Sequence, residues 1–356
     1  MADGGGREYI VRPYRPGDEQ GILDLFYRVF REDNPDMPPR SLAEWQQLFG
    51  DNPAGIQGFV ATDLGGRIIA SYASMPAFCV VAGERRLCTQ IVDTAVDQDW
   101  RKSLRKKSLF VVVGREFLAY WVKPGREPYN QYIYGLPNRR AYAAGVRILG
   151  YKPVATPMQS LVREFDTAWL EHLEAEAGDV TVEALDVAAP HEAGALFERI
   201  VREHPDEVPL GTWRDAAYLS WRYRPRGGVP YRALLARRGG EAVGAAWFRH
   251  GWAGRDVTPV VDWIGRGADR PMVAALLAGV GRAAVEATPR AAAERPVWLL
   301  DTWVMPRTPW WPTLQGLGLS ETPTDFNLCI IDSLPDHDFE WAKAHWFFTM
   351  GDSDIY

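Results

Sequence analysis

The residues in this sequence with the clearest capacity for chemistry are a concentrated group of cations and a single carboxylate just before it. The segment from Arg101 to Ser108 holds five Lys or Arg residues in eight positions, although the chain as a whole has a formal net charge of −6. Residues 108–122 follow, and their apolar spacing predicts a helix. Cations and the free N–H groups of a helix N-terminus both bind phosphate. The alternative is a solvated, charged turn before the helix.

The carboxylate is Asp93, which interrupts the apolar strand QIVDTAV three residues before Val96. A carboxylate placed there could act as a general base that takes a proton from an attacking group. It could instead be hydrogen-bonded within the strand for a structural purpose. The similar phrase TPVVDWI places Asp262 in a second strand. This recurrence favours the structural role.

The elements that would position these residues occur twice, with a period of roughly 170 residues. Each copy begins with a strand and a helix, continues with a hairpin around a Gly-Gly turn, and then alternates strands and helices. The two hairpin turns are Leu64-Gly65-Gly66 and Arg238-Gly239-Gly240. In the first copy we expect strands at 9–13, 86–100 and 132–137, helices at 108–122 and 138–150, and closing strands in YKPVATPMQSLVREF. We expect the second copy to run from about 180 to 332.

Two phrases carry a resemblance to a known family. Residues 96–101, VDQDWR, look like a V-x-P-x-x-R phrase, and Asn138-Arg139-Arg140-Ala141 followed by Leu149-Gly150-Tyr151 looks like an Asn-x-x-Ala helix with a Gly-Tyr end. In these residues the chain resembles the GNAT superfamily of N-acetyltransferases. The resemblance implies an α/β fold (α+β, with a mixed sheet) and, given the repeat, two tandem GNAT-like domains related by duplication. We place these at 1–170 and 178–335, with a tail at 336–356.

A narrower resemblance rests on short phrases in both halves. GLPN, AEWQQLFGDNPAG, YLSWRY and the terminal TMGDSD are similar to a tandem GNAT group associated with polysaccharide biosynthesis clusters. In the second half, Gly265-Arg266-Gly267 lacks concentrated cations, and Arg307-Thr308-Pro309 stands in place of the Asn-x-x-Ala phrase. We therefore interpret this half as a degenerate domain that either supports the first or recognises the substrate.

The GNAT resemblance implies roles for particular residues of the first half. The donor would be acetyl-CoA or another acyl-CoA, with Asp93 as the base. The tyrosine that serves as general acid in the family would fall at Gly145. Tyr142, one helical turn earlier, is the candidate to replace it, and a packing role is the alternative for Tyr142. Asn138 could bind the donor or simply cap its helix. The donor-binding residues implied are Val96, Arg101, Arg105, Lys106, Lys107, Ser108 and Asn138, although Ser108 and Phe110 stand where the family has small residues.

These expectations describe an acyltransferase that moves an acetyl or other acyl group from acyl-CoA to an amine or hydroxyl of a small acceptor, such as a sugar derivative. Attack would be direct, because no Cys or Ser lies in a recognisable nucleophile motif. Two alternatives remain open. One is an aminoacyl-tRNA-dependent transferase like the Fem proteins, and the other is a non-catalytic GNAT fold that binds a ligand or a partner protein.

The composition of the chain argues against several other classes of protein. Three cysteines and six scattered histidines predict no metal site and no disulfide framework. No apolar run approaches the length of a membrane span, and the N-terminus lacks a signal-peptide core, so we predict a soluble, cytoplasmic protein. The negative net charge argues against a nucleic-acid partner, with tRNA the exception under the Fem-like alternative. The acceptor and the oligomeric state are left open.

Overall fold

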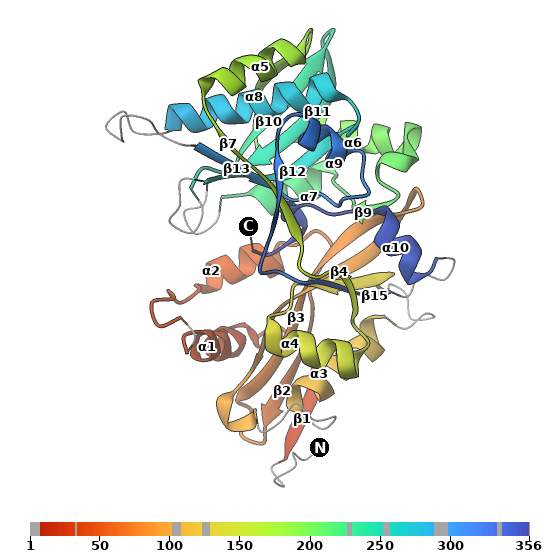
Figure 1. Ribbon diagram of the computed structural model, residues 1–356. Coiled ribbons are helices and arrows are strands. Elements are labelled where there is room, and N and C mark those ends of the chain that lie inside the picture. Colours follow the sequence, from red (N-terminus) through yellow and green to blue (C-terminus); the bar gives the residue numbers. More distant parts are fainter. Residues whose placement is uncertain are drawn as a thin grey trace. The chain divides into compact units, whose positions relative to one another are not determined.

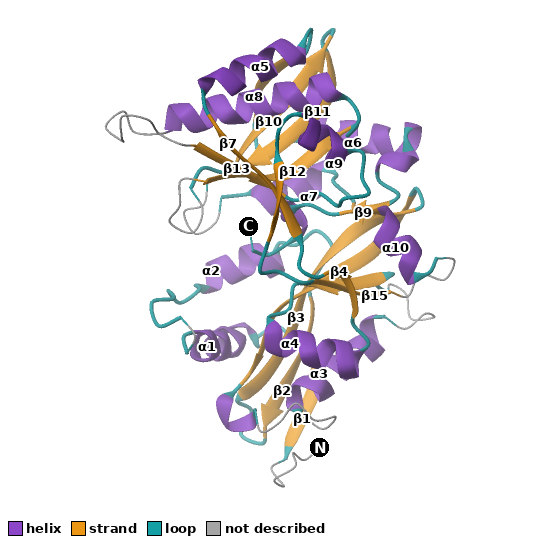
Figure 2. Cartoon of the chain, in the orientation of Figure 1, coloured by secondary structure: helices purple, strands orange, loops and turns teal. Residues whose placement is uncertain are grey.

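The computed structural model describes residues 8–32, 34–101, 108–122, 129–225, 230–251, 257–287, 298–332 and 337–355 (Figure 1). Helices alternate with strands along most of this length (Figure 2). The chain divides into two compact units, each built on a mixed sheet. The first unit comprises Met1–Phe78, Arg86–Thr156 and Phe326–Phe339, and the second comprises Cys79–Arg85, Pro157–Asp325 and Glu340–Tyr356.

The sheet of the first unit has the strand order β1-β2-β3-β4-β5-β15-β6. Neighbouring strands are antiparallel along β1-β2-β3 and β5-β15-β6, whereas β4 and β5 are parallel. The strands are β1 (Tyr9–Pro13), β2 (Gln57–Asp63), β3 (Ile68–Val81), β4 (Glu84–Val96), β5 (Tyr132–Gly135), β15 (Leu328–Asp332) and β6 (Lys152–Ala155).

Helices cover both faces of this sheet because successive side chains of a strand point to opposite sides. On β2, Val60 packs with Ile22, Leu25 and Val29 of α1, whereas its neighbour Phe59 packs with the α3 side. The apolar residues of α1 recur every three or four positions and so form one stripe. The helices are α1 (Glu19–Phe30), α2 (Leu42–Trp45), α3 (Leu109–Trp121) and α4 (Arg139–Ala144), and π-helical turns at Gln46–Gly50 and Gly145–Leu149 extend α2 and α4.

The sheet of the second unit has the order β8-β10-β11-β12-β13-β7-β14, in which only the β12–β13 pair is parallel. Its strands are β8 (Thr181–Leu185), β10 (Arg232–Arg238), β11 (Glu241–Phe248), β12 (Val257–Gly265), β13 (Trp298–Thr302), β7 (Gln159–Phe165) and β14 (Ser320–Pro323). Its helices are α5 (Thr167–Ala177), α6 (His191–Glu203), α7 (Ala216–Tyr223), α8 (Arg270–Ala287), α9 (Trp310–Gly316) and α10 (Phe339–His345). Separately, Cys79–Val81 at the end of β3 pair with β9 (Leu210–Thr212), which pairs with β16 (Trp346–Phe347).

The two sheets share one strand order, and each contains a strand from the other half of the sequence. β15 lies between β5 and β6 in the first unit, and β7 lies at the matching place between β13 and β14 in the second. The predicted α/β fold with two duplicated mixed sheets is confirmed. The units differ from the predicted domains 1–170 and 178–335, because periodicity identifies a strand but not its pairing partner.

Two segments that we expected to lie outside the domains are structured parts of the second unit. The polar stretch before residue 178 is helix α5, capped by Asp166 and buried through Trp169, Leu170 and Leu173. The tail at 336–356 contains α10, β16 and a 3₁₀ turn at Met350–Asp352. Among the described residues, no helix is both long and apolar enough to cross a membrane.

Candidate functional site

Asp93 lies on β4 where that strand departs from regular extended geometry. Its φ is +49°, and Ala82 is the other non-glycine residue with positive φ in the described parts of the chain. Aspartate and asparagine tolerate this left-handed conformation better than most residues. The parallel pairing of β4 with β5 runs from Cys88 to Gln90 and stops before Asp93. The carboxylate is thus carried on a local distortion of β4 beyond its pairing with β5.

The partner of Asp93 is Arg40, a residue that the sequence interpretation missed. Arg40 Nη1 donates to Asp93 Oδ2, and its guanidinium lies 4.5 Å from the ring centroid of Phe26 on α1. Arg40 precedes Ser41, whose hydroxyl accepts from the N–H of Glu44 in a capping box that begins α2. The Arg40 side chain is 25% exposed and that of Asp93 is 13% exposed. A solvent-reachable ion pair therefore marks this end of β4.

Val96 and Arg101, both predicted to bind the donor, contact each other. Arg101 Nε donates to the carbonyl of Val96 at 2.6 Å, and Arg101 Nη1 lies 3.2 Å from Glu32 Oε2. The Val96 side chain packs against the core beneath α3. In the structure, the Arg101 guanidinium is therefore held by the last residue of β4 and by an acidic residue after α1. Donor binding by these two residues stays a prediction.

Helix α3 begins directly after the basic segment of the sequence. Residues 102–107 of that segment are outside the part of the chain that the structure describes. Arg105, Lys106 and Lys107 lie outside the described residues. Ser108 is the N-cap of α3, and its hydroxyl accepts a 3.4 Å hydrogen bond from Val111 N. The predicted helix directly after the cations is confirmed. Contact between these cations and a phosphate stays a prediction.

Asn138 and Tyr142 have structural contacts on α4. Asn138 Oδ1 accepts from Ala141 N at 3.0 Å, which is the capping role considered from the sequence. Tyr142 packs against a core cluster that includes Val111 and Leu149. These contacts account for both residues without a ligand. Their roles in donor binding and as general acid stay predictions.

Gly145, where the family resemblance places a tyrosine, lies against the ring of Tyr151. A Cβ on Gly145 would lie 2.3 Å from Cδ2 of Tyr151, so the ring already fills the space that a larger residue needs. The Tyr151 hydroxyl is hydrogen-bonded to that of Tyr72 on β3. Burial raises the pKa of Tyr151 to about 12 and the pKa of Tyr72 well above its ordinary value. Both phenols therefore stay protonated at neutral pH.

Asp262, the counterpart of Asp93, is fully buried in the second unit. Its carboxylate accepts from Arg214 Nε at 2.8 Å, from the Tyr223 hydroxyl at 2.7 Å and from Thr349 Oγ1 at 3.0 Å. Arg214 also binds Asp352 at 2.8 Å. Burial raises the pKa of Asp262, and the cation of Arg214 opposes that shift. Asp262 thus has a structural role in the second unit.

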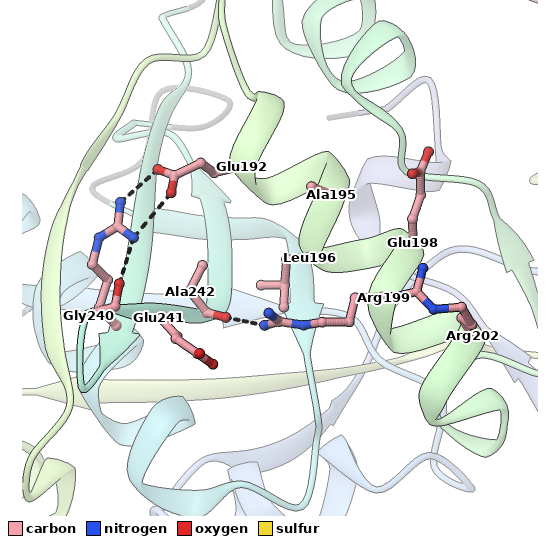
Figure 3. Close-up of a pocket in the computed structure, with 10 residues that line it drawn as sticks. Glu192, Ala195, Leu196, Glu198, Arg199, Arg202, Gly240, Glu241 and Ala242 are labelled. Atoms are coloured by element: carbon pink, nitrogen blue, oxygen red, sulfur yellow. Dashed lines mark hydrogen bonds and ion pairs between the residues drawn. The ribbon is translucent and has the colours of Figure 1, made fainter.

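A groove of about 510 Å³ between α6 and the β10–β11 hairpin of the second unit contains none of the predicted site residues (Figure 3). The guanidinium of Arg237 is held by Glu192 at 2.7 Å and by the carbonyl of Gly240 at 3.2 Å. Arg199 donates to the carbonyl of Ala242 at 2.5 Å. Both guanidinium groups are therefore already hydrogen-bonded to groups of the protein itself. We therefore place the candidate site in the first unit, at Asp93 and the start of α3.

Comparison with known proteins identifies the fold. No protein-family model and no curated protein matches the sequence. Solved structures do match. A probable N-acyltransferase of unknown function from Enterococcus faecalis V583 has a TM-score of 0.61 and 15% identity over 92% of this chain and 73% of its own. A GCN5-related N-acetyltransferase from Anabaena variabilis has a TM-score of 0.59 and 13% identity, covering 91% and 72%.

Saccharomyces cerevisiae N-myristoyltransferase, solved with bound myristoyl-CoA, is also similar, with a TM-score of 0.50 and 10% identity over 90% of this chain and 82% of its own. The chain therefore has the fold of the GCN5-related N-acetyltransferases, as the motif resemblance predicted. At these identities the likeness establishes the fold alone.

Proposed function

We propose that this protein is an acyltransferase that uses an acyl-CoA as donor, and that its active site lies in the first unit. The observation that carries the proposal is Asp93, a partly exposed carboxylate on a distorted part of β4. A strongly basic segment follows it and ends at the capped N-terminus of α3. A carboxylate base and a phosphate-binding segment are the two groups that transfer from a CoA thioester requires. Fold neighbours named as N-acetyltransferases support this reaction class.

The acceptor in this proposal is an amine or hydroxyl of a small or sugar-derived molecule. Its nitrogen or oxygen attacks the thioester carbon, a new C–N or C–O bond forms, and the C–S bond breaks. Asp93 accepts the proton that the acceptor loses. The CoA thiolate takes a proton from water or from Tyr142. Arg40 binds Oδ2 of Asp93, so the proton in this scheme goes to Oδ1, to which no bond from a described residue is seen.

Direct transfer, without an acyl-enzyme intermediate, is supported by the burial of the cysteines. Cys79, Cys88 and Cys329 are all buried. Burial also raises the pKa of Cys329 to about 12, which disfavours its thiolate. A buried thiol cannot readily accept an acyl group from a CoA thioester. Arg40 holds the Asp93 carboxylate in position in this mechanism.

Calorimetric titration with acetyl-CoA, CoA and longer acyl-CoAs tests the proposal. We expect binding that weakens at least tenfold, about 1.4 kcal/mol, when Arg105 and Lys106 are both changed to Glu. A panel of small amines and amino sugars, followed by release of free thiol, then tests transfer. Binding without transfer to any acceptor would favour a ligand-binding protein. No CoA binding, together with binding of aminoacyl-tRNA, would favour the Fem-like alternative.

A further inference from the structure

We infer that the chain has a single acyl-donor site, because residues of the second unit close both the place where a donor could bind in that unit and the place where a base could act. This inference rests on the proposed function of the first unit. The two places are the loop between β12 and α8 and the carboxylate of Asp262. Both correspond to parts of the candidate site, through the shared strand order of the two sheets.

Five backbone N–H groups between Gly267 and Val273, at the entry to α8, already have acceptors. A loop can hold a phosphate only if such groups are available to it. Pro271, in the first turn of α8, has no N–H to offer. The hydrogen bonds are Gly267 N to Glu207 Oε2 (3.0 Å), Met272 N to Asp269 Oδ1 (3.2 Å), Asp269 N to Arg266 O (2.9 Å), Arg270 N to Ala268 O (2.9 Å) and Val273 N to Asp269 O (3.0 Å).

The carboxylate of Glu207 occupies the position at this loop where a bound phosphate would lie. Its side chain is 10% exposed, and besides Gly267 it contacts Arg266, with 3.5 Å between Arg266 Nε and Glu207 Oε1. The loop is also closely packed, since a Cβ on Gly267 would lie 2.5 Å from the backbone nitrogen of Trp310 on α9. A phosphate would have to displace a buried carboxylate and move α9. The loop therefore offers neither charge nor space.

The C-terminal segment Thr349–Ser353 closes the second place. Gly351 lies so close that a Cβ there would be 2.2 Å from the Tyr223 hydroxyl and 3.0 Å from Asp262 Cγ. Arg222 stabilises this segment by donating hydrogen bonds to the carbonyls of Gly351 at 2.8 Å and Ser353 at 2.7 Å. Because Asp262 is 0% exposed beneath this segment, no acceptor can reach it.

The first unit differs at both places. Glu32, which follows α1 as Glu207 follows α6, pairs with the Arg101 side chain, and both side chains are about 30% exposed. The N–H at Val111 has only a hydroxyl cap, from Ser108. Asp93 keeps 13% of its side chain exposed. One donor per chain, bound in the first unit, follows from this difference.

Titration of the full chain with CoA tests the inference. We expect one CoA per chain in the wild type and binding at least tenfold weaker in the Arg105→Glu/Lys106→Glu variant. The matched reversal in the second unit, Arg266→Glu, should leave both the stoichiometry and the affinity unchanged. Arg266 is 54% exposed, so its substitution is compatible with folding, which a thermal melt checks. Hydrogen exchange with CoA should show added protection near Val111 and none from Gly267 to Val273.

Two CoA per chain, or a residual site that Arg266→Glu abolishes, would overturn the inference, as would CoA-dependent protection at the start of α8. A wild type that binds no CoA would have a different meaning. It would refute the proposed function of the first unit, while the second unit would still have no donor site. The failure of one proposal is therefore distinguishable from the failure of the other.

Discussion

Arg40 binds Asp93 across 53 residues of sequence, and the second unit repeats this pairing between Arg214 and Asp262. Each arginine directly precedes the N-cap of a helix, and each aspartate interrupts the strand that pairs in parallel with its neighbour. The difference lies in exposure, because the first pair reaches solvent and the second is fully buried. The duplicated pair is therefore reachable from solvent in one unit and has a structural role in the other.

Asp93→Asn should lower turnover roughly a hundredfold or more while leaving CoA affinity unchanged, within the range of general base catalysis. The amide is nearly isosteric but cannot take the acceptor's proton. Asparagine also tolerates the positive φ at this position, so the strand should keep its shape. Initial rates and calorimetry measure the two effects separately.

Asp24→Asn is the matched control for this substitution. Asp24 is an exposed carboxylate on α1 that accepts a hydrogen bond from Gln20. Its loss should leave turnover close to wild type. Equal rates in the Asp93→Asn variant and the control would show that the base lies elsewhere.

Asp262→Asn should destabilise the folded protein by about 3 kcal/mol, because it leaves the buried guanidinium of Arg214 without one of its two carboxylates. Chemical denaturation measures the change in the free energy of unfolding. Asp93→Asn serves as the comparison and should cost far less, since Arg40 is partly solvated. A small effect of Asp262→Asn would show that Asp352 alone neutralises Arg214.

Asp301 on β13 should make the protein less stable as the pH rises. Burial raises the pKa of Asp301 from 3.8 to about 6, and its Oδ1 has no hydrogen-bond partner. Between these two values the folded state holds a proton that the unfolded state has lost, so raising the pH favours unfolding. The full effect is roughly 3 kcal/mol and is reached above both pKa values.

Asp301→Asn removes this titration, and the test is the difference in unfolding free energy between variant and wild type at several pH values. The difference should grow in favour of the variant from about pH 4 to pH 6 and then level off. Asp325→Asn, at an exposed position, should show no such trend. A constant difference for Asp301→Asn would mean that Asp301 does not titrate in this range.

The strand exchange predicts that the first half of the chain cannot fold alone. A fragment ending at Gly178 lacks β15, which pairs with both β5 and β6 in the first sheet. We expect that fragment to lack a cooperative thermal transition, and the two halves expressed together as separate chains to co-purify. A soluble, cooperatively folding fragment 1–178 would contradict the exchange.

Much of the fold follows from local sequence signals. The capping box of Ser41 and Glu44, the left-handed Gly66 in the first hairpin, and the left-handed Gly150 at the end of its helix each mark a boundary by local chemistry. Pairing partners distant in sequence have no such signal. Nothing local places Asp332 of β15 opposite Tyr132 of β5. The same limit explains why the domains predicted from the sequence differ from the observed units.

Helix α5 was missed for a different reason. Its exposed acidic residues resemble those of a polar connection between domains, whereas Trp169, Leu170 and Leu173 form a buried stripe. A Cβ on Gly281 of α8 would lie 2.3 Å from Leu170, which shows how closely these helices pack. Attention to the apolar spacing beneath the charges would have identified this helix.

The candidate site was partly predictable. Asp93 stands out because a charge inside an apolar strand is costly unless it has a partner or a function. Arg40 carries a weaker signal, although its counterpart Arg214 also directly precedes a helix N-cap. The contact between Tyr151 and Gly145 could not be predicted, because it depends on how the chain turns after α4.

The exchanged strands also affect how the protein forms during synthesis. β6 ends at Ala155 and β15 ends at Asp332, so at roughly 5–20 residues per second the ribosome delivers β15 on the order of 10–35 s after β6. Until then the facing edges of β5 and β6 have no native partner, and unpaired edges attract other strands. β7, which occupies the equivalent place in the second sheet, emerges directly after β6. During synthesis, β7 is therefore available to pair with β5 and β6 before β15, their native partner, has been made.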